Sequence, residues 1–272
     1  MLFSFLVTLR EGFEIALILA IVLGYLARTG NRQHFRDIWL GTALAVVLTV
    51  AVVVGLQATA SELSGAAREA FEGFIMLGAA ATLTWMVLWM RRQAVGLGRE
   101  LRSQVDVALA RGSVLALAGL AFSAVIREGI ETALFLFAGA RASADSAGQF
   151  WAGGALGFVI AAGLGYLVYR GSHLLPIRQF FSVTGVMVLV IAAGLLSNGL
   201  AELHEAQIVG NLGGRPWDTD AILSMSSTAG RFLHALVGYD PAPTLGQIVV
   251  FWVYLGGGLV TFVAMGRSPR TS

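Results

Sequence analysis

Two charged pentapeptides interrupt otherwise apolar stretches of the chain, Arg10-Glu11-Gly12-Phe13-Glu14 and Arg127-Glu128-Gly129-Ile130-Glu131. We call them the first and second REGxE motifs. The residues that follow also correspond, since Ile15-Ala16-Leu17 matches Thr132-Ala133-Leu134. The copies begin at residues 10 and 127, and they indicate an internal repeat.

The sequence around the motifs is that of a polytopic membrane protein. Of 272 residues, 57% are hydrophobic and 12% are charged, whereas about 25% are charged in soluble domains. This composition excludes a soluble enzyme and a nucleic-acid-binding protein. Cysteine is absent, which excludes disulfides, thiolate metal sites and cysteine nucleophiles. Seven stretches reach the roughly 20 residues that a membrane-spanning helix needs: 2–27, 36–57, 69–90, 113–140, 149–171, 179–201 and 244–265.

Arginine supplies all 18 basic residues and predicts the orientation. Basic residues collect on the cytoplasmic side of membrane proteins. The arginine-rich segments between spans are therefore predicted to lie inside, with the N-terminus outside and the C-terminus inside. Arginines predicted inside are Arg28, Arg32, Arg36, Arg91, Arg92, Arg99, Arg102, Arg111, Arg170, Arg178, Arg267 and Arg270; those predicted outside are Arg68, Arg141, Arg215 and Arg231.

The repeat predicts an all-α fold of two inverted halves. Three spans separate the motifs, so the two copies run through the membrane in opposite directions. We expect a single permease domain over 1–272: repeat one at about 1–91, repeat two at about 113–202, an outer loop at about 203–243 and a seventh helix at about 244–266. Inverted repeats of three spans each place a substrate site near the midplane, between the halves.

Each motif suits a hard cation. At about 100° per residue, its arginine and both glutamates share one helix face, and its glycine leaves room for a close neighbour. An ionised group inside the membrane costs about 2.5–3.5 kcal/mol. The two motifs hold several such groups, and binding of a cation that prefers oxygen ligands would explain why they are there. The predicted metal site consists of Glu11, Glu14, Glu128 and Glu131, with Arg10 and Arg127 as charge partners. No permanently bound cofactor is expected.

Other interpretations of the motifs remain open at this point. The same carboxylates would also bind manganese or magnesium. The protein would then be a transporter of one of these ions, or a proton-coupled exporter. Ion pairs of Arg10 with Glu14, and of Arg127 with Glu131, would join helices without binding an ion, as in a purely structural subunit. A membrane-embedded di-iron carboxylate enzyme would place Glu-x-x-His pairs on its helices. No predicted span contains such a pair, so we expect no enzyme activity.

Further acidic residues gather at the predicted outer ends of the third and sixth spans. They would form an outer vestibule consisting of Glu69, Glu72, Glu202, His204 and Glu205. The longest polar segment, 206–243, also lies outside and would form a small cap or a mere connector. Trp85 and Trp89 lie near the end of a span, and we expect them to act as interfacial anchors rather than substrate contacts.

At these residues the chain resembles the oxidase-dependent iron permeases, which include fungal high-affinity iron permeases and bacterial Efe-type iron permeases. The paired REGxE motifs are similar to those of the family, and Phe71-Glu72-Gly73 and Gly238-Tyr239-Asp240 are similar to its bacterial branch. The resemblance covers essentially the whole chain. It implies that the four motif glutamates and two motif arginines take part in iron passage.

The resemblance also implies import of Fe³⁺ or Fe²⁺ across the cytoplasmic (inner) membrane. The fungal members carry an Asp-Ala-Ser-Glu signature in an outer loop. That signature is absent from this sequence, and Trp217-Asp218-Thr219-Asp220 occupies the comparable region. The bacterial system is therefore the better analogy. It implies a periplasmic iron-binding protein and a haem peroxidase or other oxidase as partners, besides iron and membrane lipid. The iron valence, proton coupling and oligomeric state stay open.

Overall fold

The computed structural model describes residues 1–93, 97–110, 114–142, 146–171, 177–224, 227, 229–230, 233–234 and 238–267. Within these ranges the chain is helical and has no strand. Each predicted span coincides with one long helix. The elements are α1 (Leu2–Arg28), the 3₁₀-helix η1 (Arg32–His34), α2 (Phe35–Glu62), α3 (Ala66–Gln93), α4 (Leu97–Ala110), α5 (Val114–Ala142), α6 (Ala147–Tyr169), α7 (Ile177–Glu205) and α9 (Leu245–Arg267).

Five of these helices, α2, α3, α6, α7 and α9, are long and apolar enough to cross a membrane. The chain is thus a multi-pass membrane protein by length and composition. Helices α1 and α5 contain 27 and 29 residues, but each carries a charged REGxE motif at its centre. That these two also span, and that the N-terminus lies outside, stay predictions.

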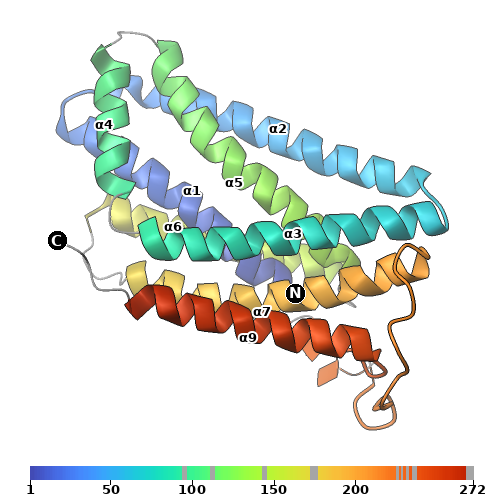
Figure 1. The fold of residues 1–272 in the computed structure, drawn as a ribbon. Coiled ribbons are helices and arrows are strands. Elements are labelled where there is room, and N and C mark those ends of the chain that lie inside the picture. The colour runs from blue at the N-terminus through green and yellow to red at the C-terminus, as the bar shows by residue number, and fades with distance from the viewer. Residues whose placement is uncertain are drawn as a thin grey trace.

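The long helices pack most extensively as three pairs, α1 with α6, α2 with α5, and α3 with α7. In the predicted repeat, α5, α6 and α7 are the counterparts of α1, α2 and α3. The α1–α6 and α2–α5 pairs would then be one packing arrangement present twice. Helices α1 and α5 run in opposite directions (Figure 1), as an inverted repeat requires. Helix α9 lies along α7.

Two buried apolar clusters lie on either side of the motifs. The first contains Phe3 and Val7 from the start of α1 and Phe135 from the end of α5. The second contains Val22 from the end of α1 and Leu117 from the start of α5. Both motifs lie between these clusters, so the charged residues occupy the middle of the helix bundle, at a distance from either helix end.

Helix α4 corrects an expectation, because the segment 91–112 was predicted only as an arginine-rich loop. Leu101, Val105 and Ala108 lie on one face of α4 and are buried in the second apolar cluster. The Tyr25 hydroxyl at the end of α1 donates a hydrogen bond to Asp106, at 2.6 Å. A search for spans of 20 apolar residues misses a 14-residue amphipathic helix, although its i, i+4, i+7 pattern is visible in the sequence.

Candidate metal site

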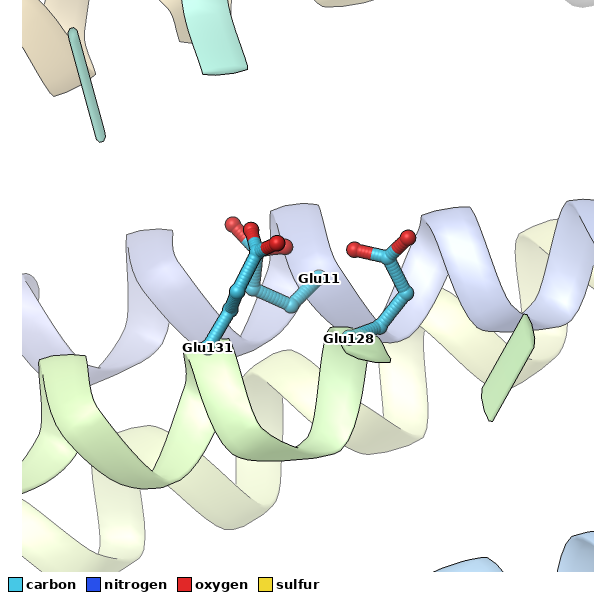
Figure 2. Close-up of side chains that lie close together, drawn as sticks. All are labelled: Glu11, Glu128 and Glu131. Carbon is cyan, nitrogen blue, oxygen red and sulfur yellow. The ribbon is translucent and has the colours of Figure 1, made fainter. Parts of the chain in front are cut away.

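The two motifs meet at the centre of the bundle. Residues 10–14 lie near the middle of α1, and residues 127–131 lie in the middle of α5. Figure 2 shows the carboxylates of Glu11, Glu128 and Glu131 pointing into one space between the two helices. One oxygen from each lies within 4.8 Å of the others. This spacing allows all three carboxylates to bind a single cation.

Glu14 reaches the same place from one turn farther along α1. It lines a cavity of about 20 Å³ together with Glu128 and Glu131. A space of this size holds about one water molecule or a bare ion. All four motif glutamates therefore converge, as the repeat predicted.

The cavity wall also includes Trp85 and Trp89 of α3. Both residues therefore lie beside the candidate site, and their role as interfacial anchors stays a prediction. The α3 helix passes beside the motifs, so Trp89 near its end contacts Arg127, whereas Trp85 is 64% exposed. Their position along the span gave no signal of this, because only the packing of α3 decides which way they face.

Arg10 is buried among the carboxylates, with 1% of its side chain exposed. Its Nη1 donates a hydrogen bond to Glu11 at 2.9 Å, and its Nη2 lies 3.2 Å from Glu14. The same two nitrogens contact sulfur atoms on α3, at 3.0 Å for Met86 and 3.3 Å for Met90. Arg10 is thus ion-paired with both carboxylates of α1.

Arg127 occupies the corresponding position on α5 in a different environment. Its guanidinium donates two hydrogen bonds to Glu128, at 2.5 and 3.0 Å, and lies over the Trp89 ring, 5.7 Å from the ring centre. Its side chain is 53% exposed. The sequence left open an ion pair between Arg127 and Glu131. In the structure Arg127 instead pairs with Glu128.

Several buried polar atoms at the site have no hydrogen-bond partner. They are Oε2 of Glu11, Oε1 of Glu14, Oε2 of Glu131 and Nε of Arg10. Oε1 of Glu14 is close to Arg10, but the geometry is not that of a hydrogen bond. A buried carboxylate oxygen without a hydrogen-bond partner costs free energy, and a cation bound between these carboxylates would remove that cost.

The motif glycines serve helix packing. A Cβ added at Gly12 would lie 3.1 Å from the Cβ of Ala161 on α6. A Cβ added at Gly129 would collide with Oγ1 of Thr49 on α2. Each glycine therefore lets its helix approach the partner helix of its pair closely. Since both glycines face away from the cavity, only the charged positions of the motif are directed toward it.

The predicted vestibule residues lie together where α3 begins and α7 ends. Glu72 is buried and accepts a hydrogen bond from Arg68 Nε at 2.8 Å, and Arg141 Nε lies 3.5 Å away. Glu202 interacts electrostatically with Glu69, Glu72 and Glu205. The Nδ1 atom of His204 contacts the Val209 carbonyl oxygen at 3.2 Å, rather than a carboxylate of this group. Whether these residues bind metal stays a prediction.

Met86 and Met90 are the site residues that the sequence reading missed. Both lie on α3, four residues apart, and so share a helix face. A methionine in an apolar span is indistinguishable from a packing residue until the neighbouring helices are placed.

Known proteins that are similar to this chain are iron permeases. Residues 1–267 match the family described as the iron permease FTR1 family. A ferrous iron permease EfeU of Escherichia coli O6:H1 is 34% identical over 276 aligned positions, covering 100% of this chain and 99% of the relative. The proteins of the same name from Yersinia pestis and Yersinia pseudotuberculosis are 34% and 35% identical. They cover 100% and 98% of this chain, and 96% and 94% of the relatives.

No solved structure matches the chain. The family match extends over nearly all of the sequence, and the relatives align along their full length. The chain therefore belongs to the iron permease FTR1 family, a family of transporters rather than enzymes.

Proposed function

We propose that this chain imports iron across the cytoplasmic membrane through the site formed by Glu11, Glu14, Glu128 and Glu131. One observation carries the proposal. Oxygens of Glu11, Glu128 and Glu131 lie within 4.8 Å of one another in the middle of the bundle, and buried oxygens of the site lack hydrogen-bond partners. The ferrous iron permeases from Escherichia coli and Yersinia support iron as the ion.

In the proposed pathway iron arrives at the acidic vestibule, passes to the four-glutamate site and leaves on the arginine-rich side. We propose that α1 and α5 span the membrane and that the N-terminus lies outside. An inside-negative potential would then assist import by about 2.3 kcal/mol per charge per 100 mV. The family resemblance further suggests that a periplasmic iron-binding protein and a haem peroxidase or other oxidase deliver iron to the outer face.

The test is uptake of radiolabelled iron by proteoliposomes that contain the purified chain and carry an inside-negative potential. Ferric and ferrous iron are supplied separately, each with and without excess manganese. We expect Glu11→Gln and Glu131→Gln to abolish uptake. Glu100→Gln, which alters an exposed carboxylate on α4, should transport like the wild type.

The alternatives give different results in the same assay. Normal iron uptake by both site variants would refute the proposed site. Iron uptake that is weak and is abolished by excess manganese would favour a manganese transporter. If neither ion enters but iron still binds at the glutamates, a partner protein must load the ion.

A further inference from the structure

We propose that the sulfur of Met86 is a ligand of the transported ion and makes the site selective for ferrous iron over magnesium and manganese. This inference rests on the proposed function and specifies the ion at the same site. Met86 is 4% exposed and forms part of the cavity wall with Glu14, Glu128 and Glu131. A sulfur atom is therefore held where the carboxylates converge.

The contacts of Arg10 show that the sulfur belongs to the charged cluster. The same nitrogen, Nη1, contacts the sulfur of Met86 at 3.0 Å and an oxygen of Glu11 at 2.9 Å. A thioether is a weak hydrogen-bond acceptor. Yet Arg10 contacts it while Oε2 of Glu11 has no hydrogen-bond partner and Oε1 of Glu14 is held only by an ion pair with Arg10, at 3.2 Å. The carboxylate oxygens, which are stronger acceptors than the thioether, are thus available to the transported ion, and the sulfur lies beside them.

The chemistry of the donor set explains what the sulfur would add. Carboxylates alone suit magnesium, calcium and manganese as well as iron. A thioether is a soft, uncharged donor, and it favours softer transition-metal ions over these hard cations. Ferric iron is harder than ferrous iron, so a mixed site of carboxylates and one thioether favours the ferrous form. Met86 would thus reject magnesium and manganese without changing the charge of the site.

X-ray absorption at the iron edge tests the contact directly. The chain has no cysteine and 7 methionines, so any sulfur bound to iron in the purified protein comes from methionine. We expect a sulfur neighbour of ferrous iron in the wild type and its loss in Met86→Leu. The matched control is Met76→Leu, an equally buried methionine on α3 that is not among the described residues lining the cavity. It should keep the sulfur signal.

Competition in proteoliposomes tests selectivity. In Met86→Leu, we expect the concentration of magnesium or manganese that halves ferrous iron uptake to fall about tenfold, the lower range for interactions that support a metal site. Met76→Leu should show the competition of the wild type. A packing role alone would alter stability or rate without altering this ratio.

The outcomes separate the two proposals. No sulfur beside iron in the wild type, or unchanged competition in a folded Met86→Leu protein, would overturn the role of Met86. If Glu11→Gln still abolishes uptake, the glutamate site stands. If Met86→Leu does not fold, Met90→Leu decides: a sulfur signal lost there would assign the contact to Met90 and overturn the proposal, whereas a retained signal supports it.

Discussion

Arg10 and Arg127 occupy equivalent positions in the two REGxE motifs but differ in exposure, since the Arg10 side chain is 1% exposed and the Arg127 side chain 53%. Arg10 is enclosed by Glu11, Glu14 and two sulfur atoms. Arg127 stands at the edge of the cavity, against the ring of Trp89. Equivalent arginines of the sequence repeat therefore lie in different environments.

This difference predicts unequal losses of stability. Arg10→Gln leaves two buried carboxylates without their countercharge, a change that costs about 3–5 kcal/mol when one partner of a buried pair is removed. Arg127→Gln should cost less than Arg10→Gln, because its guanidinium is half exposed to solvent and pairs with one buried carboxylate rather than two. Thermal unfolding of the two detergent-solubilised variants would compare them. An equal fall in Tm would contradict the unequal burial.

Close packing of α1 on α6 predicts opposite effects for two glycines of α6. A Cβ at Gly157 would collide with Oγ1 of Thr8 and lie 2.5 Å from the carbonyl oxygen of Phe5. Gly157→Ala should therefore separate the helices and lower Tm. Gly163 has open space around its Cβ position. Gly163→Ala should stabilise α6 by about 0.5–1 kcal/mol, because alanine is the better helix former. Unfolding curves that shift together for both variants would argue against this packing.

The absence of cysteine makes the predicted orientation directly measurable. We expect single cysteines replacing Ser64 and Ser146, which are exposed at the junctions before α3 and at the start of α6, to react with a membrane-impermeant maleimide added to intact cells. Cysteines replacing Thr29 and Gln104 should react only after the membrane is opened. Labelling of Thr29→Cys or Gln104→Cys in intact cells would show that α1 or α5 does not span as predicted.

The acidic vestibule predicts a change in apparent affinity without a change in maximal rate. Glu205 is exposed and interacts electrostatically with Glu202. Glu205→Gln should raise the iron concentration for half-maximal uptake, because less negative charge attracts cations to the mouth. The effect should shrink as ionic strength rises. Uptake kinetics at low and high salt would measure it, with Glu100→Gln as the control. A salt-independent loss of maximal rate would indicate a different role.

Much of the site followed from the sequence because charge is costly in an apolar span. Arg10, Glu11 and Glu14 stand out in a long run of apolar residues, and their repetition at 127–131 predicted which residues would meet. Helix α4 could not be found by the same reasoning. Its apolar face is short, and its burial depends on the surfaces that α1 and α5 offer it.

The sequence alone determined the positions of the long helices, but not of α4, and it singled out the repeat and its four glutamates, because hydrophobic length and buried charge are properties of local sequence. The tertiary structure alone decided what surrounds those glutamates. It placed Met86 and Trp89 at the cavity, paired Arg127 with Glu128, and buried Arg10 while exposing Arg127. Such differences arise from how α3 packs against α1 and α5, and no pattern within a single helix specifies that contact.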